Sequence, residues 1–210
     1  MLISKETFQD GSILVLWKME EDEEQLLAHF DEKREEYRCK IEQFPYPKRR
    51  LEFLTSRCVL KEITKCENGI YYNENGKPSL VDNLLKISIS HTNGYLTLLA
   101  HPEKVVGIDV ELKKEKIFRV KHKYLSSYEL ENIDPNKEME HLLLYWSAKE
   151  AIFKMMDIRD IDFIKDLHIN RFKIDKEGVM EAYETRTPAN LQFKLNYRIY
   201  DDFVMVWGFI

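Results

Sequence analysis

Residues 142–156 read LLLYWSAKEAIFKMM, and the rest of the chain is organised around this stretch. Its length, its content of Leu, Ala, Lys, Glu and Met, and its lack of Gly and Pro predict an α-helix. Most of its positions are apolar, which predicts burial on several sides. Ser147, Glu150 and Lys154 are spaced three and four residues apart, so they share one narrow stripe. An exposed Glu150–Lys154 ion pair would explain these charges, whereas inward-facing charges would indicate a functional site, because burying an unpaired charge is costly.

Composition limits the class of protein. The chain has 210 residues, of which 44% are hydrophobic and 12% aromatic, enough for a core in one domain or in two small ones. A net charge of −5 without a long basic run disfavours general nucleic-acid binding. The N-terminal residues lack the pattern of a signal peptide, and no apolar run approaches the roughly 20 residues of a membrane span. Cys39, Cys58 and Cys66 lack metal-ligand spacing, which favours reduced thiols in a cytoplasmic protein.

The first half of the chain predicts a mixture of strands and helices. The apolar run at residues 13–17 predicts a buried strand, and residues 21–44 predict one helical segment. A second helix is predicted from Pro47, which suits a first turn, to about residue 63. Arg49 and Arg57 lie about two turns apart on it and could reach one ligand, although a solvated basic face is the alternative. Residues 84–92 and 95–101 alternate in hydropathy around Asn93-Gly94 and predict a β-hairpin, with His91 facing away from Ile87.

The second half begins with a predicted strand at residues 104–112 and a predicted helix at residues 117–133. The helix of residues 142–156 follows, and residues 166–174, 191–200 and 203–210 then predict strands. We expect an α+β fold with two halves of similar make-up, divided as residues 1–104 and 105–210.

Carboxylates on the strand of residues 104–112 suggest chemistry. Asp109 and Glu111 project from the same face, roughly 6.5–7 Å apart at Cα, next to Gly107. A cation between them would relieve their repulsion, and Mg²⁺ suits such a pair because it also takes water and substrate phosphates as ligands. Glu150 would be a third ligand or a base. The cationic side chains left over could bind the phosphates of a ligand, namely Arg49, Arg57, Lys77, His91 and Lys154.

Four motifs resemble one family. They are GKP (residues 76–78), SISHT (88–92), VGIDVE (106–111) and WSAKEAIFK (146–154), in this order and at suitable distances. Together they resemble the 4′-phosphopantetheinyl transferases of the type that activates surfactin synthetase, and PKRRLEFLTSR (47–57) is similar to the basic helix of that family. The resemblance covers about half of the chain. Ser56 stands where Gly is usual and Thr92 where Ser is common, and neither change removes a charge.

The resemblance implies a fold, a reaction and a set of site residues. The fold would be a pseudo-two-fold pair of α/β halves with the active site in the cleft between them. The reaction would be Mg²⁺-dependent transfer of phosphopantetheine from coenzyme A to a serine of an apo acyl or peptidyl carrier protein, with release of 3′,5′-ADP. Asp109, Glu111 and Glu150 would hold Mg²⁺, and Glu150 would also be the base. The residues that match coenzyme-binding positions are Arg49, Arg57, Lys77, Pro78, Ser90, His91 and Lys154, with His91 near the 3′-phosphate and Lys154 also catalytic.

Two other functions use the same residues. A coenzyme A-binding regulator would keep the fold without the chemistry, and a metal-dependent phosphate-ester hydrolase would use water in place of the carrier serine. The role of Lys149 stays open between ligand and structure. We expect a monomer to suffice, without nucleic acid or membrane as a partner. The carrier should dock on the segment of residues 117–130, where apolar and cationic residues alternate.

Overall fold

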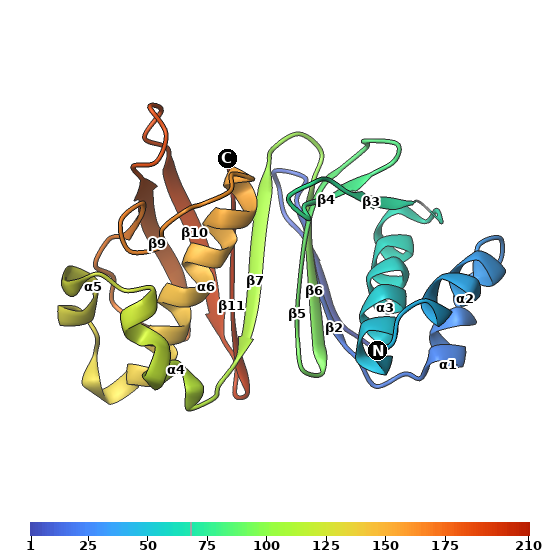
Figure 1. The fold of residues 1–210 in the computed structure, drawn as a ribbon, viewed down its shortest axis with the longest axis horizontal. Coiled ribbons are helices and arrows are strands. Elements are labelled where there is room, and N and C mark those ends of the chain that lie inside the picture. Colours follow the sequence, from blue (N-terminus) through green and yellow to red (C-terminus); the bar gives the residue numbers. More distant parts are fainter. Residues whose placement is uncertain (68) are drawn as a thin grey trace. The chain divides into compact units, whose positions relative to one another are not determined.

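The chain divides at Glu103 into two units, Met1–Glu103 and Lys104–Ile210, each with its own sheets and core (Figure 1). The computed structural model describes residues 1–67 and 69–210. Helices and strands occur in both units, so the fold class is α+β, as the sequence predicted. None of the helices in the described residues combines the length and hydropathy that crossing a bilayer requires.

Unit 1 contains a four-stranded antiparallel sheet in the order β1-β2-β6-β5. Its strands are β1 (Leu2–Thr7), β2 (Ile13–Lys18), β5 (Lys86–Thr92) and β6 (Tyr95–His101). A second, two-stranded sheet joins β3 (Ile70–Tyr72) to β4 (Pro78–Leu80). The helix α3 (Pro47–Thr64) packs its apolar side chains against the larger sheet, and α1 (Glu23–Leu27) and α2 (Arg34–Glu42) pack against α3.

The longest helix of unit 1, α3, begins and ends where its sequence permits. Pro47 occupies its first turn, where a missing N–H costs nothing, and Lys65 ends it in the left-handed conformation with φ 59°. Leu54 and Cys58 are buried in the core of unit 1. Burial of an aliphatic side chain of this size contributes about 1.5–3 kcal/mol. The packing fixes the orientation of the polar residues on α3.

Unit 2 contains a five-stranded antiparallel sheet in the order β7-β11-β10-β9-β8. Its strands are β7 (Val106–Leu112), β8 (Leu167–Ile169), β9 (Glu177–Glu184), β10 (Gln192–Ile199) and β11 (Phe203–Phe209). The long helix α6 (Glu138–Met156) packs on this sheet, and Figure 1 shows it running beside β7. Two short helices, α4 (Lys116–Val120) and α5 (Ser127–Glu131), and 3-10 turns at Lys121–Lys123 and Pro135–Lys137 fill the segment between β7 and α6.

Gly107 is required for the close packing of α6 on β7. A Cβ built on it would lie 2.1 Å from the carbonyl oxygen of Ala151 and 2.7 Å from Met155. Only a glycine permits the helix backbone to approach the strand this closely. The contact holds Glu150 and Lys154 over the face of β7 that carries Asp109 and Glu111.

Several predicted elements were wrong in extent. Residues 21–44 form α1 and α2 rather than one helix, because Glu67 accepts hydrogen bonds from the backbone N–H groups of Asp31 and Lys33 and stabilises a break there. Residues 117–133 are likewise broken into α4, a 3-10 turn and α5. Strands β1, β4 and β9 were not predicted, and the strand predicted at residues 166–174 is only Leu167–Ile169.

Candidate functional site

Asp109 and Lys154 form the centre of the candidate site in unit 2. The Lys154 Nζ donates to Asp109 Oδ1 and to the carbonyl oxygen of Ile108, at 2.8 Å in each case. Asp109 is 5% exposed. The predicted alternative, an exposed Glu150–Lys154 ion pair, does not form, since Lys154 pairs across to the strand instead. Within the described part of the chain, the Glu150 side chain makes no hydrogen bond or ion pair.

The other two carboxylates are held in partly buried positions beside Asp109. Glu111 Oε1 accepts a hydrogen bond of 3.0 Å from Trp146 Nε1, on the same helix as Glu150. Burial raises the pKa of Glu111, and the charge of Asp109 raises it further. Burial, and then the charge of Asp109, raise the pKa of Glu150 to about 7, with Lys154 opposing them. Three carboxylates therefore share one region with Lys154, and their repulsion is only partly offset.

This donor set fits a hard divalent cation. Carboxylate oxygens are the protein ligands that Mg²⁺ takes, and an ion beside Asp109, Glu111 and Glu150 would favour the charged forms that burial now disfavours. In residues 1–67 and 69–210, no group of three or more His, Cys, Asp or Glu side chains is arranged to hold a metal ion as it stands. The Lys154 ammonium is instead the cation in contact with Asp109. Binding of Mg²⁺ would therefore require these side chains to rearrange.

Lys149, next to Glu150 in sequence, is fully buried. Its Nζ donates to Glu129 Oε2 at 2.7 Å, to the carbonyl oxygen of Tyr124 at 2.8 Å and to that of Phe163 at 2.7 Å. Glu129 is 1% exposed and also accepts from the backbone N–H of Ile169. All three ammonium protons are thus used within unit 2, and Lys149 has the contacts of a structural residue.

Unit 1 brings together Arg49 and His91, two of the predicted coenzyme-binding residues, around a residue that the sequence analysis missed. Glu52 on α3 lies 3.3 Å from Arg49 Nη1 and 3.2 Å from His91 Nδ1. The sequence had placed His91 on the face of the hairpin opposite Ile87, which was wrong. Strand β5 continues in register to Thr92, so His91 lies on the side of the sheet that faces α3.

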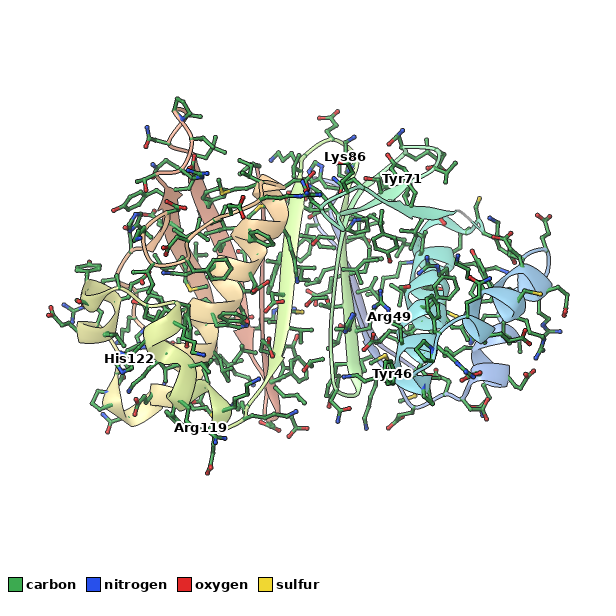
Figure 2. All side chains as sticks on the ribbon, in the orientation of Figure 1. Tyr46, Arg49, Tyr71, Lys86, Arg119 and His122 are labelled. Atoms are coloured by element: carbon green, nitrogen blue, oxygen red, sulfur yellow. The ribbon has the colours of Figure 1, made fainter. Side chains whose placement is uncertain are left out.

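A signal for Glu52 was available in the sequence. Positions 52, 55 and 59 share one helical stripe, and Glu52, Thr55 and Val59 are all buried. An acidic residue on a buried stripe of an otherwise basic helix is unusual and indicates a specific partner. Arg49 itself is exposed near the start of α3, and Figure 2 shows it there with Tyr46.

Arg57, by contrast, is built into unit 1. It is 6% exposed, and its guanidinium lies 3.7 Å from the centre of the Phe53 ring. Its Nη1 donates to Ser56 Oγ at 2.8 Å and to the carbonyl oxygen of Phe53 at 3.3 Å. Burial lowers the pKa of Arg57, and Tyr72 opposes that change. Ser56, which replaces the usual Gly, therefore helps to hold the Arg57 side chain.

The remaining predicted residues of unit 1 lie on β4, β5 and the turn before β4. Lys77 precedes Pro78, the first residue of β4, in a turn that Asn73 closes by accepting from the Lys77 N–H. Ser90 is buried on β5, and Thr92 ends that strand opposite Tyr95. Coenzyme binding by these residues stays a prediction.

A cavity of about 710 Å³ opens beside Glu111 in unit 2. Its apolar lining includes Ile117, Val120 and Tyr124, while Lys114 and Lys123 add positive charge. The remaining lining residues are Glu111, Leu112, Lys116, Leu143, Trp146 and Ile161–Ile164. Tyr124 and Leu125, which the sequence placed on an outer docking surface, are instead buried in the core of unit 2. Cationic residues of this segment stay exposed, and Figure 2 labels Arg119 and His122 among them.

Comparison with known proteins shows similarity to 4′-phosphopantetheinyl transferases. Residues 105–206 match the model of the 4′-phosphopantetheinyl transferase superfamily. The chain is 29% identical over 122 residues to the 4′-phosphopantetheinyl transferase AcpT of Escherichia coli strain K12, with 54% of this chain and 61% of the relative covered. The protein of the same name from Escherichia coli O157:H7 matches with the same identity and coverage. The chain thus covers less than two thirds of the length of these relatives.

Proposed function

We propose that this chain transfers the 4′-phosphopantetheine group of coenzyme A to a serine of an apo carrier protein, because residues 105–206 match the model of the 4′-phosphopantetheinyl transferase superfamily. The product besides the holo carrier is 3′,5′-ADP. The observation that carries the proposal is the set of Asp109, Glu111 and Glu150 around Lys154, since this set lies within the matched residues. The four motifs between residues 76 and 154 support the surfactin synthetase-activating type.

In this reaction the serine oxygen bonds to the phosphorus on the pantetheine side of the pyrophosphate, and the bond from that phosphorus to the bridging oxygen breaks. Asp109, Glu111 and Glu150 would hold Mg²⁺, which when bound neutralises charge on the pyrophosphate oxygens. Glu150 takes the serine proton as general base. Lys154 moves from Asp109 to the phosphates and stabilises the departing 3′,5′-ADP.

The basic residues of unit 1 bind the anionic groups of coenzyme A that do not react. Arg49 and Lys77 are placed at helix and strand starts and present cationic side chains, and His91 is assigned to the 3′-phosphate. The side chain of Arg57 is already engaged with Phe53 and Ser56. We therefore expect Arg57 to contribute chiefly by shaping α3, with a direct phosphate contact secondary.

The carrier protein docks at the cavity beside Glu111. A cavity lined by apolar side chains and lysines suits an acidic partner that inserts an apolar side chain, and carrier proteins are expected to be acidic. Local charge complementarity is needed because the whole chain is itself at −5. Lys123 is the best residue to test, since Lys121 already pairs with Glu138 at 2.8 Å.

One incubation tests the proposed function: the chain with coenzyme A, Mg²⁺ and an apo carrier protein, read by intact mass of the carrier. A gain of the phosphopantetheine mass is expected. Asp109→Ala should reduce the rate about a thousandfold, and excess chelator should stop the reaction. Release of 3′,5′-ADP without modification of the carrier would favour a hydrolase, and binding of coenzyme A without turnover would favour a regulator.

A further inference from the structure

Glu52 is a buried carboxylate in unit 1, and the proposed reaction gives it no role. It is 7% exposed, and two cationic side chains and a histidine lie around it. Its Oε2 is 3.3 Å from Arg49 Nη1, and its Oε1 is 3.2 Å from His91 Nδ1 and 3.8 Å from Lys48 Nζ. These residues come from two elements, since Lys48, Arg49 and Glu52 are on α3 and His91 is on β5.

The charge of Glu52 would by itself oppose the binding of an anion at this place. A carboxylate within hydrogen-bond distance of Arg49 and His91 cancels part of the positive charge that attracts a phosphate. A buried carboxylate also carries a desolvation cost. A benefit must offset both effects. The geometry indicates one, because Glu52 contacts the ends of the Arg49 and His91 side chains, which could otherwise rotate.

The contact with His91 determines which ring nitrogen a ligand meets. A carboxylate oxygen at 3.2 Å accepts a hydrogen bond, so Nδ1 carries a proton in both the neutral and the charged ring. A phosphate would therefore be contacted by Nε2, on the opposite edge of the ring. In the protonated ring, Nε2 is then the donor from which a phosphate oxygen can accept a hydrogen bond.

We infer that Glu52 is a positioning residue, which orients His91 and Arg49 so that together they recognise the 3′-phosphate of coenzyme A. The inference rests on the proposed function for the identity of the ligand. The contacts that carry it do not depend on that function, because they are made within unit 1.

The test compares Glu52→Gln with the unaltered chain in binding coenzyme A and 3′-dephospho-coenzyme A, measured by calorimetry. Loss of orientation should weaken coenzyme A binding about tenfold and leave binding of the dephospho form nearly unchanged. Relief of charge repulsion alone would strengthen coenzyme A binding. The two explanations therefore predict opposite signs, and stronger or unchanged binding of coenzyme A would overturn the inference.

Glu62→Gln is the matched control. Glu62 lies on the same helix, and its ion pairs are with Lys5 and Lys65, away from the Glu52 cluster. The control removes the same charge from α3 and should leave both affinities unchanged. In a His91→Ala background, Glu52→Gln should no longer alter the discrimination between the two coenzymes; an undiminished effect there would also overturn the inference.

A measurement without coenzyme A separates this inference from the proposed function. Glu52 contacts His91, and Lys48 and Arg49 are the charged groups of α3 that lie against Glu52. In an NMR spectrum of the free chain, the ring nitrogens of His91 report which nitrogen carries the proton, and Glu52→Gln should reduce the population with the proton on Nδ1. A chain that binds no coenzyme A but shows this change would refute the proposed function and keep the role of Glu52 in orienting His91. An unchanged Nδ1 population would refute that role.

Discussion

Replacing Lys149 with Met should destabilise unit 2 strongly, because it removes one member of a fully buried ion pair. Lys149 is 0% and Glu129 1% exposed, and three hydrogen bonds of 2.7–2.8 Å end on the Lys149 ammonium. The variant leaves the Glu129 carboxylate buried without its cation, and two carbonyl oxygens lose a donor. Removal of one partner of a buried pair typically costs about 3–5 kcal/mol. We expect a loss of stability in this range.

Urea unfolding followed by tryptophan fluorescence measures the loss, since Trp146 and Trp207 both lie in unit 2. Lys165→Met is the matched control. Lys165 is largely exposed and pairs with Asp162 at the surface, so its loss should cost less than about 1 kcal/mol. A double variant that also carries Glu129→Gln should recover at least about 1 kcal/mol of the loss, because it removes the unpaired charge.

Equal stability of the Lys149→Met and Lys165→Met variants would refute the structural role. The alternative, that Lys149 contacts the ligand, makes a different prediction. It requires a higher KM for coenzyme A with little change in the urea midpoint. The structural role requires the reverse: a large change in the midpoint and an unchanged KM in the fraction of protein that remains folded.

Four further predictions test the packing and the charges of unit 2. Gly107→Ala should lower the free energy of unfolding by about 3 kcal/mol, since the added Cβ would lie 2.1 Å from the Ala151 carbonyl oxygen; a loss below 1 kcal/mol would contradict this packing. The half-saturating Mg²⁺ concentration should rise as the pH falls below about 7, because a proton then competes for Glu150, and Glu150→Gln should flatten this dependence. Without metal, the raised pKa of Glu150 should make unfolding easier as the pH rises from 4.5 to 7, since the unfolded chain loses its proton first; urea midpoints at the two pH values check the sign. Lys123→Glu should raise the KM for the carrier and leave that for coenzyme A unchanged at low salt, with Lys165→Glu as its control.

The sequence predicted those elements whose pattern is local. Alternating hydropathy around Asn93-Gly94 located the β5–β6 hairpin, and the apolar run of residues 142–156 located most of α6. The same-face placement of Asp109 and Glu111 followed from strand geometry alone.

Contacts between distant residues determined what the sequence did not predict. Glu67, more than 30 residues away, accepts the N–H groups that stabilise the break between α1 and α2. Strand β9 reads EGVMEAYE, with Gly at its second position and charged residues on its outer face, so its pattern differs little from that of a loop. The residue pattern within a segment does not reveal the distant residues that the segment will contact.

The candidate site shows the same division between spacing and partners. Helical spacing placed Glu150 and Lys154 on one stripe, but it could not identify Asp109 as the partner of Lys154, because the 2.8 Å contact joins residues 45 positions apart. Nor could it separate Lys149 from Glu150, since adjacent residues on a helix face directions about 100° apart and either could have met the ligand. The packing of α6 separates them. Gly107 admits the helix backbone on the side of β7, so Glu150 faces the carboxylates, and Lys149 is turned into the core where Glu129 is its partner. With α6 packed on Gly107 in this way, Glu150 is available for chemistry and Lys149 is not.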